Sequence, residues 1–170
     1  MKLRIETRKI VTKSCFILFF LFFSLCFTAP LLALPINTSA PGFTLATLDG
    51  KRVSLSDYQG KFVILKLGTT WCPGCRDQDK ELLKIDAFIS EQGITLIQVF
   101  LDDPLSEIKA YQLGFPMKSP VVTLSGDEKM MRDYAVYSIP RLIILSPEQK
   151  ILSDTTGISG QKIKAQILQK

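Results

Sequence analysis

The feature that most constrains this chain is a pair of cysteines three positions apart, placed between a buried-strand pattern and an amphipathic-helix pattern. Residues 71–75 read Trp-Cys-Pro-Gly-Cys. Before them, residues 61–67 are almost continuously apolar, which is typical of a central strand covered on both faces. After them, apolar residues recur at three- and four-residue spacing until Gly93, which predicts a helix ending there. The cysteines are therefore expected where a strand leads into the start of a helix.

This position favours thiol chemistry. At a helix N-terminus, unpaired N–H groups and the positive end of the helix dipole stabilise a thiolate, so we expect Cys72 to be exposed and nucleophilic. Pro73 suits the first helical turn, because the N–H that it lacks has no partner there. Cys75 falls one turn into the helix, within reach of the same sulfur but more buried. Attack by Cys72 on a disulfide would form a mixed disulfide that Cys75 resolves.

Two other uses of a cysteine pair fit this chain less well. A zinc site needs about four ligands, and the chain has no histidine. A structural disulfide across so short a loop would constrain the unfolded chain little. The other two cysteines, Cys15 and Cys26, lie in an apolar run, where cysteine behaves as a small hydrophobic residue. We therefore expect a redox pair, no metal and no other cofactor.

The first 33 residues have the pattern of a targeting segment. Five basic residues precede position 14, and the 20 residues from Cys15 to Leu34 are mostly apolar. This pattern is typical of a secretory signal peptide. An uncleaved membrane anchor is the alternative, with its basic flank in the cytoplasm, because about 20 apolar residues cross a bilayer as a helix. Either way we expect export, to the periplasm or the outer face of the cytoplasmic membrane.

The remaining chain divides into a linker and one domain. Residues 34–41 are a polar linker bounded by prolines, and 42–170 form the domain. Five of the 21 basic residues and one of the 16 acidic residues lie before position 34, which leaves sixteen against fifteen and a net charge of +1. The basic balance thus belongs to the targeting segment, and it gives no support for a nucleic-acid surface.

The domain pattern predicts an α/β fold. Alternating residues around Asp49-Gly50 predict a β-hairpin over 43–55. Later strands are expected at 94–101, 121–124, 141–145 and 151–155, and later helices at 104–113, 127–135 and 159–170. The last two strands would form a second hairpin. Strands and helices in this order give a central mixed sheet flanked by helices.

From residue 40 onward the chain resembles the TlpA/ResA-like thiol-disulfide oxidoreductases of the thioredoxin superfamily, which overlap in sequence with AhpC/TSA-type redoxin domains. The matching segments are Ala-Pro-Gly-Phe-Thr-Leu at 40–45, Asp-Gly-Lys at 49–51, Leu-Ser-Asp at 55–57, Gly-Lys at 60–61, Thr-Trp-Cys-Pro-Gly-Cys at 70–75 and Ser-Ile-Pro at 138–140. The resemblance implies a thioredoxin-like fold with an N-terminal β-hairpin.

The resemblance also implies a function. That function is exchange of the Cys72–Cys75 dithiol or disulfide with protein thiols and disulfides. An upstream membrane partner would donate or accept the electrons. A reducing role in cytochrome c maturation or in envelope thiol homeostasis is one such function.

By the same resemblance, three residues are expected to dock the substrate. Ile139-Pro140 matches the family's cis-proline loop, which lies against the active-site disulfide and leaves backbone groups open to a substrate strand. Trp71 adjoins the first cysteine. The alternative for Pro140 is an ordinary trans proline that opens a strand.

Asp103 is a candidate proton acceptor. By resemblance it falls where several TlpA/ResA-like reductases carry a glutamate near the cysteines. A carboxylate there would take the proton of Cys75 as this residue resolves the mixed disulfide. The alternative is a solvated loop residue that caps the helix after Pro104.

Two positions depart from the family pattern. Lys66 stands six residues before Cys72, where thioredoxins have a buried aspartate and relatives often an asparagine. A half-buried ammonium there would favour a nearby thiolate and tune the ionisation of the site. The alternative is a lysine that reaches the surface from an edge strand. Gly68 replaces a bulky residue, often tryptophan, so we expect a different acid–base arrangement.

A peroxiredoxin-type thiol peroxidase is the alternative function. Peroxidatic sites resemble Pro-x-x-x-Thr-x-x-Cys. Counting back from Cys72 gives Thr69 in the threonine place but Leu65 in the proline place. Counting back from Cys75 gives neither the threonine nor the proline. A non-catalytic binding module is a third class, and the intact cysteine pair together with the proline motif argues against it.

Overall fold

The structure is a computed structural model, and it describes residues 33–169. The predicted signal peptide or anchor, 1–33, therefore lies outside the described residues but for its last one. Among the described residues, no helix has the length and apolarity to cross a membrane. The described residues all belong to one compact unit.

The elements follow the predicted order. The strands are β1 (Thr44–Thr47), β2 (Arg52–Ser54), β3 (Val63–Gly68), β4 (Thr95–Leu101), β5 (Val121–Gly126), β6 (Arg141–Leu145) and β7 (Ile151–Thr155). The helices are η1 (Leu55–Tyr58, 3-10), α2 (Pro73–Leu83), α3 (Asp86–Glu91), α4 (Leu105–Leu113), α5 (Glu128–Asp133) and α6 (Gly160–Leu168).

The strands form a mixed seven-stranded sheet in the order β2-β1-β5-β4-β3-β6-β7. Strands β3, β4 and β5 are parallel, and the other neighbours pair antiparallel. Every residue of β3 and β4 is buried, as their continuous apolar runs predicted. The β1–β2 hairpin confirms the hairpin expected around Asp49-Gly50, and Gly50 has the positive φ of +84° that such a turn requires.

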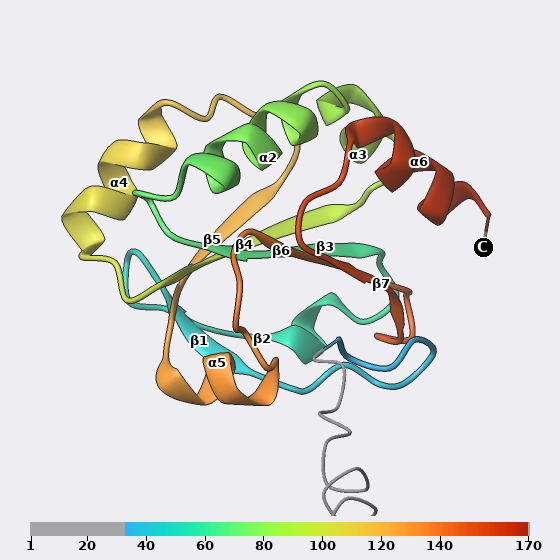
Figure 1. Ribbon diagram of the computed structural model, residues 1–170, viewed down its shortest axis with the longest axis horizontal. Helices are drawn as coiled ribbons and strands as arrows, with labels where there is room; N and C mark the ends of the chain where they lie inside the picture. Colours follow the sequence, from blue (N-terminus) through green and yellow to red (C-terminus); the bar gives the residue numbers. More distant parts are fainter. Residues whose placement is uncertain (1–32, 170) are drawn as a thin grey trace, which may run out of the picture. The chain divides into compact units, whose positions relative to one another are not determined.

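Helices cover the sheet on both faces (Figure 1). One face carries α2, α3, α4 and α6, and the other carries α5. Side chains alternate along β3: Ile64 packs into the core beneath α2 and α6, whereas Leu65 and Leu67 pack into the core beneath α5. Lys66 therefore points to the α2 face.

The helix predicted up to Gly93 is two helices, so this expectation was wrong. The chain breaks between α2 and α3, where the Ile85 N–H bonds to the Leu82 carbonyl at 3.0 Å in a tight turn. The start of α6 packs against this break, because a Cβ on Gly160 would lie only 2.7 Å from Ile85 Cγ2. The Gly160 N–H also bonds to a Glu81 carboxylate oxygen at 3.0 Å.

The segment expected as a linker, 34–41, lies along the β6–β7 hairpin rather than free of the domain. The Asn37 N–H bonds to the Ile151 carbonyl at 2.8 Å, and the Ile151 N–H bonds to the Thr38 carbonyl at 2.9 Å. The Ala40 N–H reaches the Gln149 carbonyl at 2.9 Å. Backbone groups left open by a hairpin thus hold this segment, and its polar composition did not reveal that.

Candidate active site

The two cysteines lie at the N-terminus of α2, as the sequence predicted. Cys72 is the N-cap residue, and its Sγ accepts a hydrogen bond from the Cys75 N–H at 3.3 Å. Pro73 is the first residue of the helix. Both cysteines are free thiols. A sulfur in this place receives one of the helix's unpaired N–H groups and faces the positive end of its dipole.

The exposure of the three motif residues differs sharply. Trp71 is 67 % exposed, Cys72 is 7 % exposed and Cys75 is fully buried. The expectation of an exposed Cys72 was therefore wrong, whereas the burial of Cys75 is confirmed. The cause is the loop before β6, since Cys72 Sγ lies 3.9 Å from the Ile139 carbonyl oxygen.

That loop brings Pro140 onto the start of α2. The peptide bond between Ile139 and Pro140 is cis, as the family resemblance implied. A Cβ on Gly74 would lie 3.1 Å from Pro140 Cδ and 4.0 Å from Cys72 Sγ. Gly74 therefore permits the close approach of the proline loop to the first cysteine, a contact that the motif alone does not reveal.

Gly68 makes room for the second cysteine. A Cβ at Gly68 would lie 2.6 Å from Cys75 Sγ, a distance that no side chain tolerates. The departure from a bulky residue here thus has a packing cause: the Cys75 sulfur rests directly on the backbone of β3. The sequence showed the departure but not its reason.

Burial changes the acidity of Cys75. Removal from water, reinforced by its hydrogen bond to the Cys72 sulfur, raises the pKa of the Cys75 thiol to about 12. The charge of Lys66 and a hydrogen bond from the Thr69 backbone act in the opposite direction. Cys75 is therefore held as a thiol and needs a proton acceptor before it can attack a disulfide.

Lys66 lies in a buried ion pair, so its alternative as a surface-reaching lysine on an edge strand was wrong. It belongs to the central strand β3, is 2 % exposed, and pairs with Asp79 of α2. The Asp79 carboxylate also accepts hydrogen bonds from Gln98 at 3.0 Å and from the Tyr111 hydroxyl at 2.5 Å. Sequence reasoning missed Asp79, although it follows Cys75 by four residues on the buried face of a helix.

Asp103 is buried beside the turn that precedes the cysteines. It is 8 % exposed, so the alternative of a solvated loop residue was wrong. One carboxylate oxygen accepts the Thr70 N–H at 3.0 Å and the other accepts the Thr70 hydroxyl at 2.8 Å. Asp103 thereby fixes the residue that leads into Trp71. Its role as proton acceptor stays a prediction.

Two further residues hold the loops around the site, and both escaped sequence reasoning. The guanidinium of Arg141 pairs with Asp154 and donates to the carbonyls of Tyr134 and Ala135, which steadies the loop that ends at Pro140. A charged residue at the head of an apolar strand was the available signal. On α2, Gln78 bonds to both the N–H and the carbonyl of Ile158, at 2.8 and 3.0 Å.

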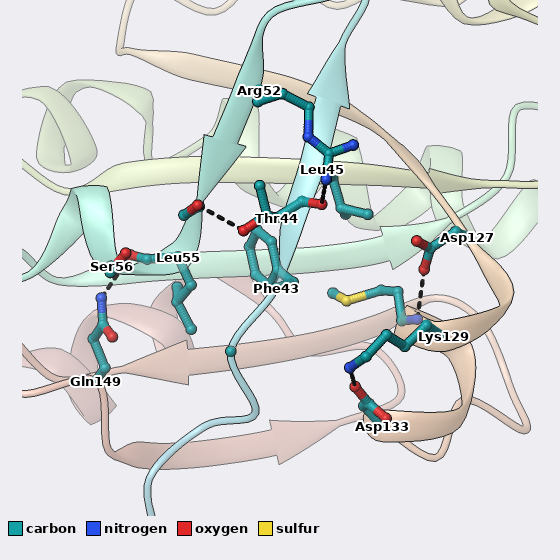
Figure 2. Close-up of a pocket in the computed structure, with 13 residues that line it drawn as sticks. Phe43, Thr44, Leu45, Arg52, Leu55, Ser56, Asp127, Lys129, Asp133 and Gln149 are labelled. Atoms are coloured by element: carbon teal, nitrogen blue, oxygen red, sulfur yellow. Dashed lines mark hydrogen bonds and ion pairs between the residues drawn. The ribbon is translucent and has the colours of Figure 1, made fainter.

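A cavity of about 530 Å³ lies apart from the cysteines, between β1, η1 and α5 (Figure 2). Its charged side chains already have partners: Lys129 pairs with Asp133, and Asp127 accepts the Met130 N–H. No group of acidic, cysteine or histidine side chains suited to a metal ion occurs within 33–169.

Known proteins are similar to this chain in sequence and in fold. The thiol-disulfide oxidoreductase ResA of Bacillus subtilis (strain 168) is 28 % identical over 121 residues, which cover 71 % of this chain and 67 % of that protein. The protein of the same name from Bacillus thuringiensis subsp. konkukian is 26 % identical over 132 residues, covering 78 % and 74 %.

Solved structures of similar fold include thiol-disulfide oxidoreductases. The thioredoxin domain of a thiol-disulfide oxidoreductase from Bacteroides vulgatus superposes with a TM-score of 0.70 at 25 % identity, over 81 % of this chain and 98 % of that one. A putative thiol:disulfide interchange protein DsbE from Chlorobium tepidum gives a TM-score of 0.71 at 23 % identity, over the same shares, and shows the fold alone. The predicted thioredoxin-like fold and the predicted kinship with thiol-disulfide oxidoreductases are confirmed. The AhpC/TSA family pattern matches residues 36–153, and the chain belongs to this family.

Proposed function

We propose that this thiol-disulfide oxidoreductase exchanges its Cys72–Cys75 pair with the thiols and disulfides of exported proteins. The observation that carries the proposal is the pair's placement: Cys72 Sγ at the helix N-terminus, 3.3 Å from the Cys75 N–H, with Pro140 packed beside it. In the reducing direction, the Cys72 thiolate attacks a partner disulfide and one partner sulfur leaves as a thiolate. Cys75 then attacks Cys72, the intramolecular disulfide forms, and the second partner thiol is released.

The surface around Cys72 suits a protein partner. Trp71 and Tyr137 are 67 % and 72 % exposed, although large aromatic side chains are usually covered in a monomer. Trp71 adjoins Cys72 in the chain, and Tyr137 lies two residues before Ile139 in the proline loop. A partner strand lying across Ile139-Pro140 would cover both rings and pair with backbone groups of the loop. We propose Trp71, Ile139 and Pro140 as the docking residues.

The N-terminal pattern supports a location outside the cytoplasm, in the periplasm or on the outer face of the membrane. A thiol reductant there needs electrons from a membrane donor, because exported compartments are oxidising. Cytochrome c maturation and envelope thiol homeostasis are the processes that match this chemistry.

The test uses the two single cysteine variants and a protein disulfide substrate. Cys72→Ser should lose turnover and form no mixed disulfide. Cys75→Ser should also lose turnover but should accumulate mixed disulfides through Cys72, detectable on non-reducing gels. Full reductase activity in either variant would contradict the dithiol mechanism.

Thiol peroxidase activity is the second candidate, because the AhpC/TSA match favours it. A peroxidase must hold the peroxide oxygens in line with its sulfur by specific donors. The peroxidatic proline is absent from both registers, and the cis-proline loop that we propose as the docking site lies beside Cys72 instead. Stopped-flow oxidation followed by Trp71, the single tryptophan of the chain, should be faster with a protein disulfide than with equimolar hydrogen peroxide. The reverse order would favour the peroxidase.

A further inference from the structure

The buried ion pair of Lys66 and Asp79 lies against the resolving cysteine from two directions. Lys66 and Gly68 are two residues apart on β3, so they share one face of the sheet. A single point above Gly68 is 2.6 Å from Cys75 Sγ and 3.9 Å from Lys66 Cε. Asp79 follows Cys75 by four residues on α2, one turn further along the same helix face. Sulfur, ammonium and carboxylate thus converge between β3 and α2.

The pair is almost completely buried, and one side of it faces a groove. Lys66 is 2 % and Asp79 is 4 % exposed, and the Lys66 ammonium lies 6.0 Å from the centre of the Phe100 ring and 5.7 Å from that of the Tyr111 ring. The open side is a groove of about 370 Å³ between α2 and α4, whose lining includes Asp79 and Tyr111. A proton on the Asp79 carboxylate therefore has a way to solvent.

Resting on the proposed dithiol exchange, we propose that Asp79 receives the proton of Cys75 when that residue resolves a mixed disulfide, with Lys66 as the cation that faces the resulting thiolate. Before the step the site holds a thiol, an ammonium and a carboxylate. After it, the site holds a thiolate, the same ammonium and a carboxylic acid. The proton moves and the net charge does not change.

Constant net charge is the physical advantage of this arrangement. A lone thiolate buried beneath α2 would cost far more than the thiol, since burial penalises the charged form. Exchange of the anionic partner of Lys66, from Asp79 to Cys75, avoids an unpaired buried charge. The thiolate then attacks Cys72 Sγ. The new disulfide forms, the bond from Cys72 to the partner breaks, and the partner sulfur leaves with the electron pair. Lys66 returns to Asp79, whose proton departs through the groove.

Asp79 rather than Asp103 is the acceptor in this proposal, because Asp79 pairs with the ammonium that faces the sulfur, whereas both carboxylate oxygens of Asp103 are bonded to Thr70. The ionisable groups that contact the pair do not compete for this proton. Tyr111 donates its hydroxyl hydrogen to Asp79, and burial together with that hydrogen bond raises its pKa, so it stays protonated. Arg76 lies over the Tyr111 ring at 6.0 Å, and a guanidinium offers no acceptor for a proton. Cys72 is bonded to the partner in the mixed disulfide and cannot accept a proton.

The experiment separates the two chemical steps with dithiobis(nitrobenzoate) as the probe. The reduced domain should release two coloured thionitrobenzoate anions in sequence, the first by attack of Cys72 and the second by resolution through Cys75. The variant Lys66→Met with Asp79→Asn removes both charges and leaves no unpaired ion, so it is expected to fold. Its first phase should match that of the parent. Its second phase should be slower by about tenfold or more at pH 7, the size of effect expected from losing an opposite charge beside a thiol.

The pH profile supplies the readout that a structural role would not move. In the variant, the second phase should rise with pH to a plateau at higher pH than in the parent. The matched control is Lys129→Met with Asp133→Asn, which makes the same two substitutions in the ion pair on α5, on the opposite face of the sheet, and should leave the profile of the second phase in place. An unchanged second phase in the double variant, or an equal delay in the control, would overturn the proposal. Absence of a second phase in the parent protein would instead contradict the dithiol exchange itself.

Discussion

Two buried ion pairs among residues 33–169 lie on opposite faces of the sheet. Lys66–Asp79 has side-chain exposures of 3 % and 6 %, and Arg141–Asp154 has 5 % and 3 %. Their strands are neighbours, with Leu67 of β3 paired to Arg141 of β6. Because successive residues of a strand alternate faces, Lys66 points toward α2 and Arg141 toward α5. Burial alone does not distinguish the two pairs.

The groups that surround the two pairs differ. The Arg141 guanidinium also serves two backbone carbonyls, of Tyr134 and Ala135, and such groups need a permanent donor when they are buried. The Lys66–Asp79 pair borders a thiol and a phenol, which can exchange protons, and it reaches a groove. We infer that a buried charge bound to backbone carbonyls holds a loop in place, whereas one bound to titratable side chains serves chemistry. The predictions below test this distinction.

The largest effect is expected from Arg141→Met. It would remove the cation that pairs with the Asp154 carboxylate and the donor of two buried carbonyls, and loss of one partner of a buried pair costs about 3–5 kcal/mol. Urea unfolding of the oxidised domain measures it as a drop in the free energy of unfolding. A loss below about 1 kcal/mol, the range of surface pairs, would remove the structural role from this pair.

A smaller change in stability is expected from the double variant Lys66→Met with Asp79→Asn. Replacing both members of a buried pair by neutral side chains is often close to neutral, so we expect a free energy of unfolding within about 1 kcal/mol of the parent. The amide introduced at position 79 would still meet Gln98 and Tyr111. A loss as large as that of Arg141→Met, measured by the same urea titration, would erase the contrast between the pairs.

A loss of stability is also expected at alkaline pH. Burial raises the pKa of Cys75 above 9.0 to about 12, so its contribution to stability is complete below pH 9 and declines as the pH rises toward 12. Burial also raises the pKa of Tyr111 and of Tyr134, which lie on opposite faces of the sheet. The disulfide form lacks the Cys75 thiol, whereas the tyrosines are present in both forms. Urea titrations at pH 8 and pH 10.5 should therefore show a larger alkaline loss for the reduced domain. Equal losses in the two forms would mean that burial does not raise the pKa of Cys75.

Short sequence patterns predicted most of the secondary structure and the two cysteines at the centre of the site. The cysteine motif, the proline motif and the alternation of strands and helices each reside in a few consecutive residues, so sequence patterns report them directly. The sequence showed that Lys66 and Gly68 depart from the family pattern. It did not show their contacts, because Asp79 and Cys75 belong to α2 and meet these residues only after α2 packs on the sheet.

The ion pairs and the exposure of Cys72 needed the assembled fold for the same reason. Arg141 finds Asp154 through the pairing of β6 with β7, and its carbonyl partners follow α5. The cover over Cys72 comes from a loop 67 residues later in the chain. Spacing along the sequence predicts which residues face a core, but not which polar groups from distant segments meet there.

The contact between Leu34 and Asp154 gives the domain a mechanical property. The Leu34 N–H donates to Asp154 Oδ2 at 2.8 Å, and that oxygen lies 2.5 Å from Arg141 Nη2. One carboxylate thus clamps the incoming chain and, through a single guanidinium, the loop of Pro140. Displacement of residue 34 therefore reaches the loop of Pro140 through the side chains of Asp154 and Arg141.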